Sequence, residues 1–466
     1  MKTIFIFLLF ICGVASAQTT TFFKTYGNGR GRCVEQMTDS NYIVVGITHN
    51  FTSWGDIYLL KINQYGNIIW NKHYGDTSPD DVFGVHQTKD GGFIVAGFKG
   101  IPDTLIDGID TSFDFKVVPW IIKTNGNGDT IWTRIWNERS DYISIKQLSD
   151  TNYIVAGTLN PDSSGNNRAS LIKLDTNGEI IWSNSYENNG FVFDVIETVE
   201  NGLLFVGNKN GLIITKTDSA GTILWEKNYV NLSWGEQLII TNDNNFAIAG
   251  GANDFFYGKF NINNGDTIWT KYLGGNNLDF SNSLDQCEDG GYILTGITKS
   301  FGLGESSIWL VRTNENGDTL WTRTYGNTTG FDKGFSVHQT FDNGFIVTGY
   351  ISIGITQEMV LIKADSLGNA PALLVNEIAD ANLFFSAFPN PASNSSTINV
   401  LLPHSQEISL ELYDAQGKLV KLITNGKVSK GTHQYNVSLT NISEGVYFYR
   451  LVTEKAIYSK KLVVIK

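Results

Sequence analysis

Apolar and polar residues alternate along most of this chain in short runs separated by glycine-rich turns. The stretch VFGVHQTKDGGFIVAG at 82–97 has two such runs around Asp-Gly-Gly, and GFSVHQTFDNGFIVTG at 334–349 repeats it around Asp-Asn-Gly. A period of two indicates a half-buried strand, and Asp-Gly or Asn-Gly between two runs indicates a hairpin. Each copy continues with an apolar run that ends in Lys or Arg, a polar turn, and a strand with Trp. The pattern therefore predicts units of four short strands.

The units recur along residues 19–369. The second strand of each unit ends on a glycine, and these glycines are Gly46, Gly97, Gly157, Gly207, Gly250, Gly296 and Gly349. Seven copies of about 50 residues, each with four strands, are typical of propeller blades, which bury their apolar faces against one another. We therefore predict an all-β chain with a seven-bladed β-propeller at 18–369.

The last copy lacks its Trp strand. After Lys363 the chain runs ADSLGNAPALL, whereas FFKTYG at 22–27 matches WTRTYG at 321–326 and places Phe22 at the Trp position. An unpaired edge strand exposes a row of backbone donors and acceptors. We therefore predict that the N-terminal strand completes the last blade and closes the ring.

Residues that repeat in every unit have structural explanations. Trp and the Tyr of the following Tyr-Gly, such as Tyr74, are expected between blades, where large rings bury the most area. A basic residue ends each third strand. It could pair with turn carboxylates, cover apolar surface with its methylene groups, or form a repeated ligand site. Repetition in all units favours a scaffold, because a binding site needs asymmetry.

Two consecutive residues of each first strand are candidates for the centre of the propeller. The more variable series is Glu35, His86, Lys146, Ile196, Ile239, Asp285 and His338, and the residue that follows is mostly Gln. Successive strand residues face opposite ways, so one series at most lines the channel. We take His86, His338 and Asp285 as channel-facing candidates. One blade separates the two histidines, which argues against a shared metal ion or an acid–base pair and favours exposed histidines.

Motifs for catalysis are absent from the sequence. It has no H-E-x-x-H, no G-x-S-x-G and no EF-hand loop. We assign no catalytic residue, metal ligand or cofactor. Asp-rich loops at 75–81 and 101–114 could hold calcium, although turn formation explains the same composition. The insertion at 98–119 breaks the repeat and is the best position for recognition of a ligand.

Composition and the N-terminus restrict the class of protein. The 466 residues carry a formal charge of -12, which argues against a nucleic-acid partner, since such partners need clustered Lys and Arg. Lys2, an apolar run and Ala15-Ser16-Ala17 resemble a secretory signal at 1–17, with cleavage between Ala17 and Gln18. No other run is long enough to predict a transmembrane helix. Cys33 and Cys287 are expected to be free thiols.

The repeat stops near residue 370, and the charge changes sign. Residues 383–466 carry +4 and residues 18–382 carry -17. Alternating runs such as ISLELYDAQGKLVKLI at 408–423 predict a small β-sandwich at 385–466, after a linker at 370–384. An ordinary Ig-like adhesive module is one interpretation.

The motifs of this module support a more specific interpretation. They resemble the type A sorting domain of the type IX secretion system of Bacteroidetes. The matching residues are Phe388, Pro389, Asn390, Pro391, Tyr413, Asp414, Gly417, Gly445, Tyr447, Lys461 and Lys466. The resemblance implies export through the periplasm and outer membrane, with the translocon and a sortase-like peptidase as partners. The protein would then be secreted or held at the cell surface.

The propeller repeat is similar to repeats of large bacterial and archaeal surface proteins of undetermined activity. Two functions therefore stay open for it. One is a non-enzymatic scaffold that binds a surface glycan or protein. The other is a polysaccharide hydrolase or lyase with its site at a channel mouth, which should show carboxylates or histidines from several blades with perturbed pKa values. A binding protein should show exposed aromatic residues instead.

Overall fold

The computed structural model divides into two compact units, Met1–Ala372 and Leu373–Lys466, which are described separately. It describes residues 20–50, 55–102, 115–136, 140–159, 167–186, 190–232, 234–251, 253–328, 330–354, 356–371, 384–402, 405–414, 418–453 and 457–465. Several predicted features lie outside these residues: the signal segment with Ala17 and Gln18, most of the insertion at 98–119, most of the linker, Gly417 and Lys466.

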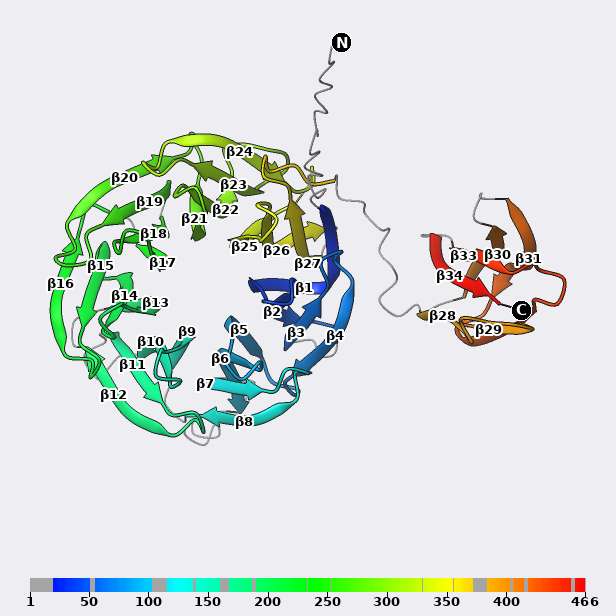
Figure 1. The fold of residues 1–466 in the computed structure, drawn as a ribbon, viewed down its shortest axis with the longest axis horizontal. Coiled ribbons are helices and arrows are strands. Elements are labelled where there is room, and N and C mark those ends of the chain that lie inside the picture. Colours follow the sequence, from blue (N-terminus) through cyan, green and yellow to red (C-terminus); the bar gives the residue numbers. More distant parts are fainter. Residues whose placement is uncertain are drawn as a thin grey trace, which may run out of the picture. The chain divides into compact units, whose positions relative to one another are not determined.

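The N-terminal unit consists of antiparallel sheets that stand around a central axis (Figure 1). Among the described residues, five sheets have four strands each. Their strands are β5 (Asp80–Gln87), β6 (Phe93–Pro102), β7 (Phe115–Thr124) and β8 (Thr130–Ile135); β9 (Ser140–Gln147), β10 (Tyr153–Leu159), β11 (Arg168–Leu174) and β12 (Ile180–Tyr186); β13 (Phe191–Glu197), β14 (Leu203–Asn208), β15 (Leu212–Thr217) and β16 (Ile223–Tyr229); β17 (Gly235–Ile240), β18 (Phe246–Gly250), β19 (Phe255–Phe260) and β20 (Thr267–Leu273); and β21 (Asp279–Gln286), β22 (Tyr292–Thr298), β23 (Ser307–Thr313) and β24 (Thr319–Tyr325). This arrangement is β-propeller-like, as the repeat predicts.

One larger sheet joins the two ends of the unit. Its order is β25-β26-β27-β1-β2-β3-β4, so the first strand lies between the last three strands and the next three. Phe22 of β1 pairs with Lys363 of β27, and Gln36 at the other end of β1 pairs with Tyr42 of β2. The bounds are β1 (Phe22–Gln36), β2 (Tyr42–Thr48), β3 (Asp56–Ile62), β4 (Ile68–Tyr74), β25 (Lys333–Gln339), β26 (Phe345–Ile353) and β27 (Thr356–Ala364).

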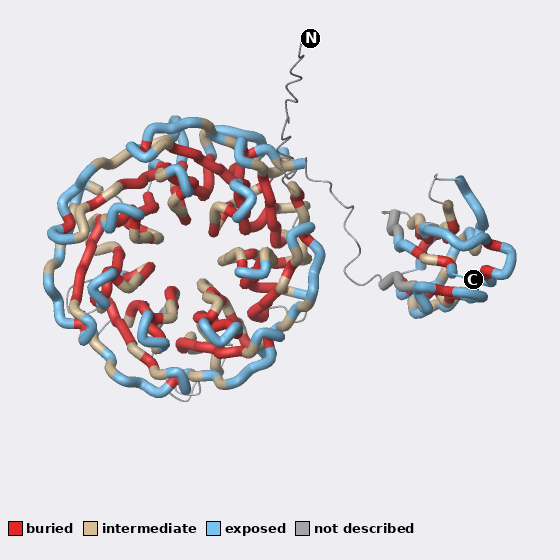
Figure 2. The backbone as a smooth tube through the Cα atoms, in the orientation of Figure 1, coloured by how far each residue is buried: buried red, intermediate tan, exposed pale blue. Residues whose placement is uncertain are grey.

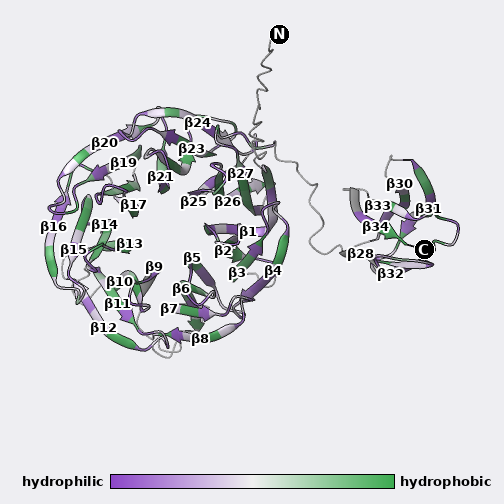
Figure 3. Ribbon diagram, viewed as in Figure 1, coloured by the Kyte–Doolittle hydropathy of each residue, from purple (hydrophilic) through white to green (hydrophobic). Residues whose placement is uncertain are grey.

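The second and third strands of each sheet form the core. Their residues are buried on both faces because neighbouring sheets pack against them, whereas the outermost strands are mostly exposed (Figure 2). One apolar cluster joins Val45 of β2 to Phe93 of β6 and Ile122 of β7. Hydropathy follows this division only in part, since apolar residues fill the middle strands and also begin outer strands such as β4 and β16 (Figure 3). Packing between sheets therefore stabilises the unit, as expected for repeats that cannot bury an apolar face alone.

Aromatic residues of each outer strand contact a turn glycine of the following sheet. A Cβ added to Gly128 would lie 2.9 Å from the ring of Trp70, and one added to Gly66 would lie 3.0 Å from the ring of Phe22. These glycines have φ of +78° and +75°, so the conformation and the close ring both select glycine. Tyr74 donates a hydrogen bond of 2.5 Å to the carbonyl of Gly128. The predicted location of Trp and Tyr between units is confirmed.

The basic residue of each third strand pairs with a carboxylate of the first hairpin turn in its own sheet. This bears out the first of its predicted roles. The pairs are Lys61–Asp39 at 2.8 Å, Lys123–Asp90 at 2.9 Å, Lys173–Asp150 at 2.7 Å, Lys216–Glu200 at 2.8 Å, Lys259–Asp243 at 2.8 Å, Arg312–Asp289 at 2.5 Å and Lys363–Asp342 at 3.0 Å.

The C-terminal unit is a two-layered β structure. One sheet has the order β28-β29-β32 and the other β31-β30-β33-β34. Inward-facing residues such as Val400, Leu410 and Tyr449 form its apolar core. The bounds are β28 (Phe384–Phe388), β29 (Ser395–Leu402), β30 (Gln406–Asp414), β31 (Leu419–Val428), β32 (Gly431–Ser438), β33 (Gly445–Thr453) and β34 (Ile457–Val464).

Two further expectations concern the whole chain. Cys33 and Cys287 are free thiols, as predicted. In the described part of the chain, no helix has the length and apolar character to cross a membrane.

Candidate functional site

The innermost strands of the N-terminal unit surround a cavity of about 120 Å³. These strands are β1, β5, β9, β13, β17, β21 and β25, and each contributes to the lining. Because side chains from seven inner strands meet here, the cavity is the first candidate for a functional site. The inner strands carry two groups of side chains that differ in chemistry: histidines paired with carboxylates, and cations packed against aromatic rings.

The polar residues of the wall connect neighbouring inner strands. An innermost strand has no further strand on its channel side, so some of its N–H groups lack ladder partners. The N–H of Leu238 donates to Oδ2 of Asp194 at 3.1 Å, and the N–H of Val337 donates to Oγ of Ser283 at 3.1 Å. Each acceptor belongs to the preceding sheet, so much of the polar character of the channel serves the scaffold.

The predicted channel residues take part in the same connections. Nδ1 of His86 lies 3.1 Å from Oε1 of Glu35, whose other oxygen accepts the N–H of Gln87 at 3.1 Å. On the other side of Glu35 along the ring, Nδ1 of His338 lies 3.4 Å from Oδ2 of Asp285, which accepts the N–H of Gln339 at 3.0 Å. The histidines are partly buried and not fully exposed as the sequence suggested, because each lies beside a carboxylate of the preceding sheet.

Electrostatics favour the ionised form of Glu35 and the protonated form of His338. Burial opposes ionisation of Glu35, but His86, Lys146 and His338 outweigh it and lower its pKa to about 2. Burial also opposes protonation of His338, yet the hydrogen bond and charge of Asp285 raise its pKa above the ordinary value. Glu35 therefore stays ionised at neutral pH. It accepts the N–H of Gln87, as Asp285 accepts the N–H of Gln339, so both carboxylates connect neighbouring sheets.

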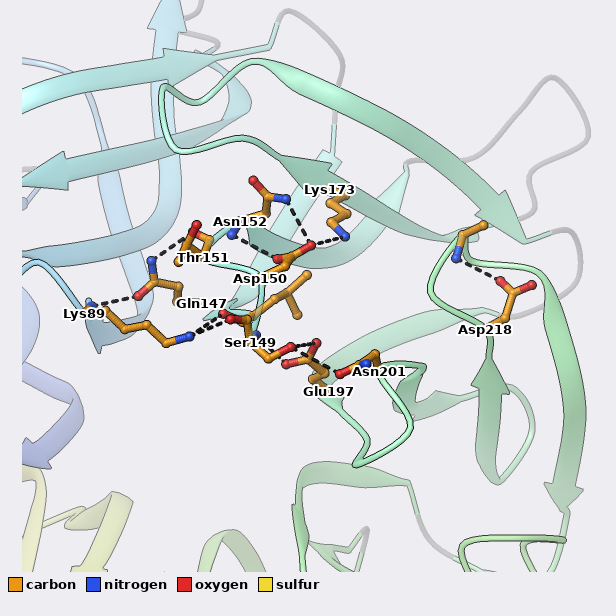
Figure 4. Close-up of polar contacts among 12 residues, drawn as sticks. Lys89, Gln147, Ser149, Asp150, Thr151, Asn152, Lys173, Glu197, Asn201 and Asp218 are labelled. Carbon is orange, nitrogen blue, oxygen red and sulfur yellow. Dashed lines mark hydrogen bonds and ion pairs between the residues drawn. The ribbon is translucent and has the colours of Figure 1, made fainter.

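The Gln series forms a second set of connections, at the turn that follows each inner strand. Oε1 of Gln147 accepts the N–H of Lys89 at 2.8 Å, and Glu197 accepts the N–H of Ser149 at 2.6 Å (Figure 4). The same contact joins Phe341 to Gln36, Asn242 to Gln286 and Glu288 to Gln339. Each Gln or Glu thus fixes the turn of the preceding sheet.

Cations and rings alternate where the inner strands begin. The guanidinium carbon of Arg32 lies 5.4 Å from the ring centre of Phe83 and 4.7 Å from that of Phe335. The ammonium nitrogen of Lys333 lies 4.6 Å from the ring centre of Phe335 and 4.4 Å from that of Phe280. We call these five residues, which belong to β5, β1, β25 and β21, the cation–aromatic ladder. Phe83, Phe335 and Arg32 also line the cavity.

The two cations of the ladder have different environments. Nη2 of Arg32 pairs with Oδ2 of Asp81 at 2.7 Å. Burial lowers the pKa of Lys333 to about 8; Glu236 opposes this change, and Arg32 and Arg30 add to it. Among the described residues, no carboxylate is within ion-pair distance of the Lys333 ammonium. Its direct contacts are cation–π contacts with the two rings.

The ladder lies at the end of the unit where connections vary in length. The first and second strands are joined by short turns of constant length, as from Gln36 to Tyr42 and from Gln339 to Phe345. The connections between second and third strands differ: two residues separate Ile353 from Thr356, whereas twelve separate Pro102 from Phe115. Variable loops beside a rigid scaffold are the usual position of binding sites.

Repeat alignment places several ladder residues together. Arg32, Phe83 and Phe335 each stand three residues before Glu35, His86 and His338. These three residues were not predicted from the sequence, because only the polar series that follows them was considered. Their matching positions in the repeat were a signal for them. The Asp-rich loop at 75–81 has its own partners, including Asp76 with Lys99 at 2.7 Å. Within the described ranges, no group of three or more His, Cys, Asp or Glu residues could hold a metal ion.

The sorting-signal residues are distributed over both sheets of the C-terminal unit. Nδ2 of Asn390 donates to the carbonyl of Lys461 at 2.6 Å, and its Oδ1 accepts the N–H of Val463 at 2.8 Å. Tyr413 donates to Glu411 at 2.7 Å, and Tyr447 donates to the carbonyl of Ser443 at 3.0 Å. Gly445 begins β33 with φ of +150°. Asn390 therefore fastens the start of the module to its last strand.

Comparison with solved structures bears on the fold alone. Raptor of Chaetomium thermophilum matches over 75% of this chain and 29% of its own, with 9% identity and a TM-score of 0.51. The Pan2 WD40 domain of Neurospora crassa matches over 76% and 98%, with 10% identity and a TM-score of 0.48. A protein of unknown function from Bacteroides caccae matches over 64% and 94%, with 14% identity and a TM-score of 0.42. Curated proteins gave no match.

Comparison with protein families identifies the C-terminal unit. Residues 386–466 match the model described as "Secretion system C-terminal sorting domain". The match covers the region in which the sequence motifs predict such a domain. The C-terminal residues therefore form a sorting domain of type IX secretion, and they follow a β-propeller-like unit in the chain.

Proposed function

We propose that this protein is an exported binding protein whose propeller, at 18–369, is a non-enzymatic scaffold that recognises a surface glycan or protein. The cation–aromatic ladder at the channel mouth carries this proposal. It joins four neighbouring inner strands, lies beside the variable connections, and presents ring and cation surfaces that are common in recognition sites.

The scaffold in this proposal is a seven-bladed ring closed by the N-terminal strand. The pairing of Phe22 with Lys363 supports closure, since it gives the last three strands a fourth. Phe22 also lies against Gly66 as Trp321 lies against Gly368. A closed ring leaves no blade edge free for pairing with other chains.

Export is the second part of the proposed function. The sorting domain indicates secretion by the type IX system, with release to the medium or retention at the cell surface. We propose the translocon and a sortase-like peptidase as its partners and residues 1–17 as a cleaved signal. Deletion of residues 386–466 should leave the protein in the periplasm of a host that has the system. Appearance of the truncated protein in the medium would contradict the sorting role.

An enzymatic propeller is less consistent with the channel. Carboxylates and histidines of neighbouring sheets do meet there, but Glu35 and Asp285 accept backbone N–H groups, and both histidines are in ion pairs. A polysaccharide hydrolase or lyase needs an acid and a base with pKa values near the working pH. The lowered pKa of Glu35 and the raised pKa of His338 fit a charged scaffold better.

The experiment is a glycan array combined with a pull-down from surface extracts, using the mature chain 18–466. A variant with Phe83→Ala and Phe335→Ala should lose the captured ligand. The control is Phe341→Ala, because this ring is 64% exposed and lies in a turn at the other end of the inner strands. Equal capture by both variants would contradict a site at the ladder, and turnover of any polysaccharide would favour the enzyme.

A further inference from the structure

The cations at the channel mouth stand out against the charge of their domain. Residues 18–382 carry a formal charge of -17, yet Arg30, Arg32 and Lys333 lie close enough together for the two guanidinium groups to lower the pKa of the lysine. Like charges repel, so three neighbouring cations destabilise one another unless an anion lies beside them. The mouth is therefore a local positive site on an acidic protein.

Lys333 is the least compensated of these cations. Arg32 has Asp81 at 2.7 Å, and Arg30 donates to Oε1 of Gln357 at 2.5 Å. The half-buried ammonium of Lys333 has two ring faces but no ion-pair partner among the described residues. Rings replace only part of the hydration that a buried ammonium loses. Glu236 favours the charge of Lys333 without an ion-pair contact, and an anion placed at this nitrogen would add a counter-charge in direct contact.

The surroundings of the cations indicate what carries the anion. Phe83, Phe193 and Phe335 line the same cavity as Arg32, and Asn282 and Glu236 add polar groups. Flat rings stack against apolar C–H surfaces, and side-chain amides and carboxylates bind hydroxyl groups. The cavity of about 120 Å³ leaves room beside the mouth for a polar substituent. A sugar ring against the phenylalanines, with its charged group at the mouth beside Lys333, is consistent with these features.

We propose that the channel mouth binds an acidic sugar, with a carboxylate or sulfate group of the sugar against Lys333, near the positive charge of Arg32, and with the sugar ring against the phenylalanines. This inference rests on the proposed function and names the ligand class of the same site. The rest of the domain is acidic and repels anions. An acidic sugar is therefore bound only where its charged group enters the mouth and meets the cations.

The test compares matched ligands by calorimetry on the mature chain 18–466. The probes are trigalacturonate, its methyl ester, galactose 6-sulfate, neutral galactotriose and a penta-glutamate peptide. We expect trigalacturonate or galactose 6-sulfate to bind at least about tenfold more tightly than the uncharged probes, as loss of one charge-assisted contact would give. The two acidic probes distinguish carboxylate from sulfate. Equal binding of acid and ester, or tightest binding of the peptide, would overturn the inference.

Lys333→Met tests whether the charge of Lys333 contributes to ligand binding and not to stability of the fold. Met keeps the length and the contact with the rings, so the melting temperature should be unchanged or higher, whereas affinity for the acidic sugar should fall about tenfold. The control is Lys299→Met, since the ammonium of Lys299 lies 4.3 Å from the ring centre of Phe331, which is not part of the cation–aromatic ladder. Unchanged affinity of Lys333→Met would overturn the inference. If the wild type captures a neutral glycan through the ladder rings, the proposed function holds while this inference fails.

Discussion

The phenol of Tyr26 donates a hydrogen bond of 2.9 Å to the carbonyl of Gly66, the contact that Tyr325 makes with Gly368 at 2.6 Å. Tyr26 precedes every complete unit in the sequence, yet it behaves as a residue of an outer strand. The strand that contains it, β1, contributes its first half to one sheet and its second half to the next. Stability of the whole unit should therefore depend on residues near the N-terminus.

Phe22→Ala should destabilise the propeller strongly. The ring is 5% exposed and lies against Gly66 and Tyr42, so its removal should cost about 3 to 5 kcal/mol of unfolding free energy. Urea denaturation of the mature chain measures this change. Phe341→Ala, at a ring that is 64% exposed, should have little effect.

Deletion of residues 18–28 is the stronger form of this test. It removes the strand that pairs with β27 and leaves that strand as a free edge. The melting temperature should fall by many degrees, and an unchanged melting curve would contradict closure by the N-terminal strand.

Gln147→Leu should weaken the connection between two neighbouring sheets. The variant removes the acceptor for the N–H of Lys89 and the donor to the carbonyl of Thr151, which lie at 2.8 and 2.9 Å. We expect a loss of about 1 kcal/mol, because the freed groups can bind water at this partly exposed position. Chemical denaturation should detect it, and Gln64→Leu at an exposed turn position should not change the transition. Equal transitions for both variants would show that the Gln series is dispensable.

The propeller should lose stability in acid. Partial burial opposes ionisation of Asp90, but hydrogen bonds from Lys123 and Thr88 outweigh it and lower its pKa to about 2. The pKa values of Asp39, Asp150 and Asp342 are lowered in the same way. A carboxyl group with a lowered folded pKa adds stability above its unfolded pKa, about 4, and this stability is lost as pH falls through the folded value.

Thermal denaturation between pH 7 and pH 2 measures this dependence. The melting temperature should decline below about pH 4. Asp90→Asn should make the decline shallower, since the variant has one such group fewer, and Glu315→Gln in an exposed turn should leave the profile as in the wild type. A profile of Asp90→Asn identical to the wild type would mean that the pair with Lys123 contributes nothing.

Asn390→Ala should loosen the sorting domain without touching its core. Two hydrogen bonds join this side chain to the backbone of β34, and their loss should cost about 1 to 3 kcal/mol. We expect a lower export yield in a host with the type IX system and a lower melting temperature of the domain. Asn425→Ala, at an exposed position of β31, is the matched control. Normal export of both variants would show that the motif does not act through this contact.

Much of the architecture could be predicted because its information is local. Alternation, Asp-Gly turns and the period of the repeat indicated four-stranded units, and the motif around Asn390 indicated the sorting domain. The position of Trp70 between sheets followed from its size and its repetition. These predictions needed only the neighbours of each residue along the chain.

The candidate site was predicted less well because its neighbours come from different units. The sequence correctly placed His86 and His338 in matching positions, but it did not indicate that Glu35 and Asp285 would be their partners. Nor did it indicate that Arg32 would lie between Phe83 and Phe335, which are far from it in the chain.

The sequence by itself therefore determined the strands, the repeat and the address for export. Only the tertiary structure decided which polar residues connect neighbouring sheets by hydrogen bonds and which cations lack an ion-pair partner among the described residues. The physical reason is that pairing energies depend on distances of a few ångströms between side chains. In this protein those distances are set by how neighbouring sheets pack, and Lys333, with two rings and no counter-ion among the described residues, becomes distinctive only after that packing is known.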